Sequence, residues 1–78
     1  MERIIQLENG DYIDLESILS ITNLMPVNGW YSFFIYMKLH KEPLEIRTAP
    51  VKHCIEELHD TRKKLIDKWK EWVEGQSN

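Results

Sequence analysis

Apolar and polar residues alternate along the first half of the chain, and this pattern predicts short β-strands. Residues 3–8 and 11–15 alternate in this way, and the Asn9-Gly10 pair lies between them. Asn-Gly favours a two-residue hairpin loop because both residues tolerate positive φ. Residues 18–25 alternate less cleanly, and residues 44–48 alternate again. The sequence therefore predicts antiparallel strands joined by short turns.

The run at residues 30–39 differs, because it alternates apolar residues with aromatic ones. One face of this predicted strand carries Tyr31, Phe33, Ile35, Met37 and Leu39. The opposite face carries Trp30, Phe34 and Tyr36. A single helix can cover only one face of a sheet, so the second apolar face needs another cover.

The predicted strand at residues 44–48 has the features of an edge strand. Pro43 precedes it and cannot donate a main-chain hydrogen bond to a ladder. Glu45 and Arg47 place charges on one of its faces, and charges discourage further pairing. We therefore expect this strand at one edge of the sheet.

From Pro50 onward the apolar residues recur at spacings of three and four. They are Val51, Cys54, Ile55, Leu58, Leu65, Ile66, Trp69, Trp72 and Val73. At 100° per residue they fall within an arc of about 120°, which is typical of an amphipathic helix. The helix is predicted over about residues 50–74, before Gly75, and residues 75–78 are predicted to form a frayed tail.

These elements together predict an α+β fold. An antiparallel β-meander of four to five strands, within residues 3–48, is followed by one long C-terminal amphipathic helix packed on one sheet face. The 78 residues suit one small domain, which we expect to span residues 1–78. A chain of this length buries only a modest core and gains from sharing one with another chain.

Composition narrows the classes of function. The first residues lack the apolar region of a signal peptide, and no apolar run approaches the ~20 residues of a membrane-spanning helix. We therefore expect a cytoplasmic protein without membrane association. Cys54 is the one cysteine, so no intrachain disulfide is expected. The net charge of −3 argues against general binding of polyanions.

Motifs for metal or catalytic chemistry are missing from the sequence. His53 and Cys54 are adjacent and His59 is six residues beyond His53, so a helix divides them between faces. There is no Cys-x-x-Cys, His-Glu-x-x-His or glycine-rich phosphate loop. We expect no metal, no cofactor, no small-molecule substrate and no enzymatic activity.

Arg62 interrupts the apolar stripe of the predicted helix, between Leu58 and Leu65. In one interpretation its stem packs while the guanidinium reaches water or a strand acid such as Glu45. In the other, Arg62 marks a border, beyond which the helix projects past its own sheet. A helix of about 24 residues is ~36 Å long, whereas strands of six to eight residues span ~20–27 Å.

Two classes of function fit these patterns. The first is a non-catalytic protein-protein interaction module that forms a homodimer or binds a larger protein; an accessory or inhibitor protein of a phage or mobile element is one hypothesis of this class. Its expected surface comprises Trp30, Phe34, Tyr36, Leu65, Ile66, Trp69, Trp72 and Val73. The alternative is a binder of single-stranded nucleic acid, in which the aromatic face stacks bases and Lys38 and Arg47 contact phosphates. The acidic net charge disfavours this alternative.

Overall fold

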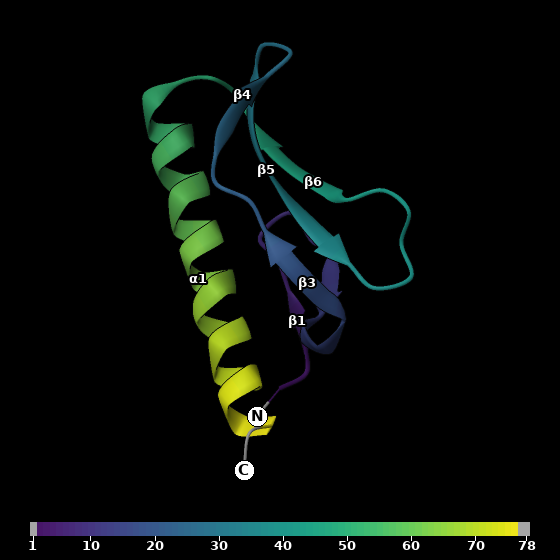
Figure 1. Cartoon of the computed structure of the whole chain (residues 1–78). Helices are drawn as coiled ribbons and strands as arrows, with labels where there is room; N and C mark the ends of the chain where they lie inside the picture. The colour runs from purple at the N-terminus through teal and green to yellow at the C-terminus, as the bar shows by residue number, and fades with distance from the viewer. Residues whose placement is uncertain (1, 77–78) are drawn as a thin grey trace.

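The structure is a computed structural model that describes residues 2–76 (Figure 1). Antiparallel strands are followed by one C-terminal helix packed against them, which confirms the predicted α+β class. The elements are β1 (Ile4–Gln6), β2 (Tyr12–Asp14), the 3-10 helix η1 (Leu15–Ser17), β3 (Ile18–Ile21), β4 (Met25–Val27), β5 (Trp30–Met37), β6 (Leu44–Thr48) and α1 (Lys52–Gln76).

The strands divide between two sheets, whereas the sequence suggested one meander. β1 and β2 form a separate hairpin, and η1 leads from it into the larger sheet. The hairpin loop also differs from the prediction. The N–H of Leu7 binds the carbonyl of Asp11 at 2.7 Å, which places three residues in the loop. Gly10 alone among them takes positive φ, at 97°, so the loop is not the two-residue form that needs two such residues.

β5 is the centre of the larger sheet. β3 and β4 pair with its two halves along one edge, and β6 pairs with it along the other. The chain bends at Thr22, between β3 and β4. The Thr22 hydroxyl accepts a hydrogen bond from the N–H of Phe34 at 2.9 Å, which frees the Thr22 carbonyl to turn away from β5.

The core lies between this sheet and a second layer made of α1, η1 and the β1–β2 hairpin. Phe33 and Ile35 are fully buried on the inner face of β5, as the alternation predicts. Tyr31 and Met37 on the same face are half-buried. Leu39 is fully exposed, which contradicts its predicted place on this face. It lies in the turn after β5 with a φ of 66°, so the strand alternation has already ended.

α1 runs the whole length of the molecule, from the β4 end past β3 and β1 (Figure 1). It spans Lys52–Gln76, so Gly75 lies within the helix instead of ending it. Of the predicted tail, residues 77 and 78 lie outside the described residues. The helix does not project beyond its own chain from Leu65 onward, because Leu65 is only 1% exposed. The hairpin and η1 cover it here, and Trp69 and Trp72 pack against the same core.

Arg62 joins α1 to the bend between β3 and β4. Its Nε donates to the Thr22 carbonyl at 2.7 Å, and its Nη2 donates to Asn23 Oδ1 at 3.1 Å. Arg62 is half-buried, and its guanidinium binds this bend and not Glu45. Leu58 and Leu65, on the two sides of Arg62 along the helix, are both buried, so α1 is covered by its own chain beyond Arg62 as well as before it.

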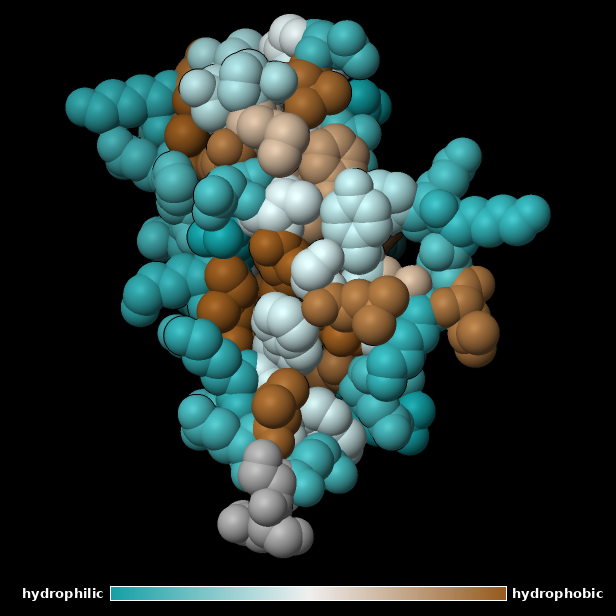
Figure 2. Space-filling model, in the orientation of Figure 1, coloured by the Kyte–Doolittle hydropathy of each residue, from teal (hydrophilic) through white to brown (hydrophobic). Residues whose placement is uncertain are grey.

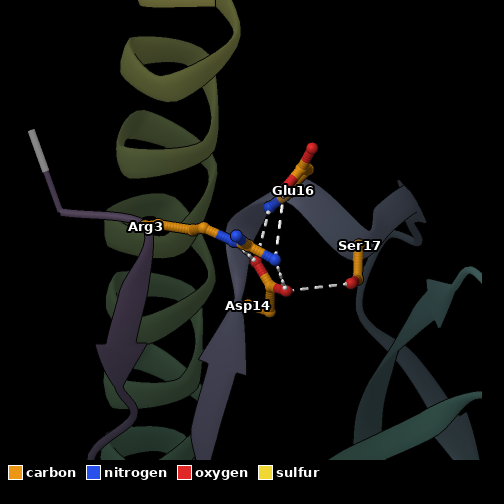
Figure 3. Close-up of polar contacts among 4 residues, drawn as sticks. All are labelled: Arg3, Asp14, Glu16 and Ser17. Carbon is orange, nitrogen blue, oxygen red and sulfur yellow. Dashed lines mark hydrogen bonds and ion pairs between the residues drawn. The ribbon is translucent and has the colours of Figure 1, made fainter.

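Asp14 fastens the hairpin to η1 (Figure 3). Nε and Nη2 of Arg3 donate to its two carboxylate oxygens at 2.9 Å each. The N–H of Glu16 and the hydroxyl of Ser17 also donate to this carboxylate, at 3.0 and 3.2 Å. The hydrogen bond from Arg3 is the main cause that lowers the pKa of Asp14 to about 2, and it raises the pKa of Arg3. The charged carboxylate therefore stabilises the fold.

The hydrogen bonds to the charged Asp14 carboxylate predict that the protein loses stability in acid. The pKa of Asp14 lies below its usual value of 3.8, so the stabilisation is complete above about pH 4 and disappears as the pH falls towards about 2. The urea midpoint of the wild type should fall more steeply over this range than that of Asp14→Asn, which has no carboxylate to protonate. Asp11→Asn is the control, and it should keep the wild-type slope. Parallel slopes for the wild type and Asp14→Asn would contradict the prediction.

Candidate protein-interaction surface

The face of the larger sheet that points away from the core is called the outer face below. The strand registers place residues from all four strands on it. They are Ser20, Met25, Val27, Trp30, Ser32, Phe34, Tyr36, Glu45 and Arg47. Trp30, Phe34 and Tyr36, which the sequence predicted to share a face, therefore lie together.

The aromatic residues of the outer face are open to solvent to different degrees. Trp30 is 42% exposed and Tyr36 is 44% exposed, while Phe34 between them is half-buried. No helix or strand within residues 2–76 packs over them, because α1 and the hairpin lie on the inner face. The outer face thus remains uncovered over the described part of the chain.

Polar contacts order the β6 side of the outer face. Ser32 is fully buried, and its hydroxyl donates to Glu45 Oε2 at 2.7 Å. The guanidinium carbon of Arg47 lies 4.8 Å from the ring centroid of Trp30, a cation–π arrangement. A carboxylate and a guanidinium therefore stand beside the aromatic residues in fixed positions.

The helical half of the predicted surface does not join this face. Leu65 is buried in the core, and Trp69 and Trp72 are half-buried against it. Ile66 is also half-buried. Val73 is 50% exposed near the end of α1. From the sequence, the helix end of one copy was predicted to lie against the aromatic face of another, because the helix stripe alone does not show that η1 and the hairpin cover Leu65.

Other exposed apolar residues were not part of the predicted surface. They are Ile4, Tyr12, Leu19, Leu39 and Val51. Leu19 is exposed at an irregularity of the β3–β5 pairing, where the register shifts between Ile18 and Ser20. Such a bulge depends on the pairing of two strands, so a single-strand pattern does not reveal it.

Metal-binding side chains do not gather in the described part of the chain. No three His, Cys, Asp or Glu side chains within residues 2–76 are placed to hold a metal ion. Cys54 is half-buried, not a core residue as its place in the stripe suggested, and its sulfur lies 3.4 Å from His53 Nε2. An open groove between β1 and α1 is lined by charged residues of both signs, including Glu2, Glu8, Lys64 and Lys68.

Hydrophobic and moderately polar side chains run down the middle of the face shown in Figure 2, with hydrophilic side chains on both sides. α1, the one long helix among residues 2–76, lacks a stretch apolar enough to cross a bilayer. Comparisons with protein-family models, with curated proteins and with solved structures give no significant match.

Proposed function

We propose that this protein is a non-catalytic protein-interaction module and that the outer face is its binding surface. One observation carries the proposal: Trp30 and Tyr36 lie exposed on the central strand, and no element within residues 2–76 covers them. A strand that buries one face in its own core and presents aromatic residues on the other is suited to bind a second surface.

The chemistry of the outer face supports a protein as the partner. Trp, Tyr and Arg are the residue types in which binding energy concentrates, and this face has one of each in Trp30, Tyr36 and Arg47. Met25 and Val27 add apolar area, and the charges lie at the β6 margin. An apolar centre with a polar margin is the usual anatomy of a protein interface.

A second copy of the chain is the simplest partner. The core has few fully buried side chains, as expected for a small domain. Joining two outer faces would bury Trp30 and Tyr36 of both copies and enlarge the apolar area removed from water. Because each face meets its own equivalent, the contact is closed and gives a dimer instead of a filament.

Light scattering after size-exclusion chromatography tests this proposal. We expect the mass of the wild type to rise between about 1 µM and about 1 mM. Tyr36→Glu should prevent the part of the association that uses the outer face, because it places a charge in the contact between the two faces. Tyr12→Glu is the matched control, because Tyr12 is 71% exposed but lies on the hairpin. Identical behaviour of the wild type and both variants would contradict outer-face association.

One contact favours the nucleic-acid alternative: Arg47 lies over Trp30, so a cation stands beside an aromatic platform. Under that hypothesis a single-stranded oligonucleotide quenches tryptophan fluorescence, and salt reverses the quenching. Glu45 on the same face and the net charge of −3 oppose it. We expect no quenching at physiological salt.

A further inference from the structure

The outer edge of β6 is an open strand edge. Within residues 2–76, β6 pairs with β5 alone. The opposite edge of the sheet is interrupted, because Arg62 binds the Thr22 carbonyl between β3 and β4, Pro26 of β4 has no N–H, and the register of β3 is irregular between Ile18 and Ser20. β6 lies against α1, but no strand within residues 2–76 pairs with the outer edge of β6 (Figure 1). It is therefore the edge to which another strand can add.

The main-chain groups of Glu45 and Arg47 point to this open edge. Phe34 directs both its N–H and its carbonyl towards Thr22, at 2.9 Å each, and so away from β6. Phe34 lies opposite Glu45 in the β5–β6 register, so this pair exchanges no main-chain hydrogen bond. Because hydrogen-bonded and non-hydrogen-bonded pairs alternate in an antiparallel ladder, Glu45 and Arg47 direct their N–H and C=O groups outward.

We infer that two copies of this chain pair through their β6 strands, antiparallel, about a twofold axis at Ile46. In this register Glu45 lies opposite Arg47 of the second copy, and Arg47 lies opposite Glu45 of the second copy. Each of these two pairs exchanges two main-chain hydrogen bonds, and its side chains lie on one face at contact distance. The outer faces of the two copies then form one continuous surface.

The charges of β6 select this register and a second copy as the partner. A twofold axis at Glu45 or at Arg47 sets like charges opposite each other, which is unfavourable. The axis at Ile46 sets opposite charges together twice. Charged residues usually discourage pairing at an edge, but here the chain is complementary to itself. Pro43 has no N–H and ends the new ladder beyond Glu45.

Both charged side chains are accessible and ordered before pairing. Glu45 and Arg47 are exposed, and their contacts with Ser32 and Trp30 limit their freedom. Arg47 has no carboxylate partner within residues 2–76. Side chains that are already held lose less entropy when they pair across an interface.

Edge pairing goes beyond the proposed function, because it uses main-chain groups of β6 and leaves the outer face open. Tyr36 lies opposite Ser20 of β3, across the sheet from β6. The two associations therefore respond to different substitutions: Tyr36→Glu removes outer-face association, while charge reversal on β6 removes edge pairing. Failure of one leaves the other intact.

A charge-swap series measured by light scattering tests the edge. Glu45→Arg and Arg47→Glu should each weaken this dimer about tenfold or more, since each single change sets like charges opposite in both pairs. The double variant Glu45→Arg/Arg47→Glu should restore the dimer to within about threefold of the wild type. Glu42→Arg, the same charge change in the exposed turn before β6, is the control and should have no effect. Circular dichroism confirms that each variant is folded.

Amide hydrogen exchange reports directly on the edge. In the dimer the amides of Glu45 and Arg47 should become protected, and on dilution they should exchange freely. The Ile46 amide points to β5 and should stay protected in both states, which makes it the internal reference. A wild type that stays monomeric at about 1 mM, a double variant that is not restored, or a dimer with unprotected Glu45 and Arg47 amides would each overturn the inference.

Discussion

Replacing Leu65 by alanine is expected to lower the free energy of unfolding by about 2–5 kcal/mol. Leu65 is 1% exposed and belongs to the same core cluster as Leu7, Ile13 and Leu15 of the hairpin and η1. Removing its isobutyl group loses hydrophobic transfer energy and leaves a cavity between two layers that relax only partly. Urea unfolding at low micromolar protein concentration measures the loss without a contribution from self-association.

Lys70→Ala is the control for this substitution. Lys70 is exposed on the same helix, and Lys and Ala have similar helix propensities, so we expect a change within about 0.5 kcal/mol. If Leu65→Ala destabilised no more than Lys70→Ala, the second half of α1 would not be covered by its own chain. Leu65→Val gives a smaller cavity and keeps the comparison usable if the alanine variant fails to fold.

The long helix and the strands could be predicted from the sequence because local patterns of apolar and polar residues determine them. The change of spacing at Pro50 predicts a helix, and the observed helix begins at Lys52. Alternation in residues 30–39 predicts that Phe33 and Ile35 share a face, and both are fully buried. Periodicity assigns an element and its faces because side-chain direction follows directly from backbone geometry.

How the helix, the strands and the hairpin pack against one another could not be predicted from these patterns. The helix stripe shows that Leu65 is apolar but not which segment lies against it, and strand lengths alone suggested an uncovered end. The cover comes from η1 and the hairpin, which precede the larger sheet and fold back under α1. The bend at Thr22 likewise depends on Arg62, 40 residues away along the chain. Such long-range contacts leave no periodic signal.

The candidate surface was predicted only in part, because periodicity shows which residues of one strand share a face but not which strands lie beside it. Trp30, Phe34 and Tyr36 share a face because they alternate on one strand. The contacts of Ser32 with Glu45 and of Arg47 with Trp30 depend on the β5–β6 register. Register also decides that Glu45 and Arg47 face the open edge. These features follow from pairing between strands, which the single-strand pattern leaves undetermined.

Phe33→Ala and Phe34→Ala should differ strongly, although the two residues are adjacent and identical. Phe33 is fully buried on the inner face, so its loss should cost about 3–5 kcal/mol. Phe34 is half-buried on the outer face, where less contact is lost, and we expect less than half of that cost in the monomer. Urea unfolding at low micromolar concentration gives both values, and Phe33→Leu substitutes for an alanine variant that does not fold.

Measuring the destabilisation by Phe33→Ala and Phe34→Ala at several protein concentrations tests whether a second copy covers the outer face. The cost of Phe33→Ala should not change with concentration, because the inner face is covered by the chain itself. The cost of Phe34→Ala should rise with concentration if a second copy covers the outer face, since the wild type then gains stability from association that the variant loses. Equal costs for the two substitutions at every concentration would contradict the assignment of an inner and an outer face to β5. A cost of Phe34→Ala that stays low at about 1 mM would instead leave the outer face to a larger protein partner.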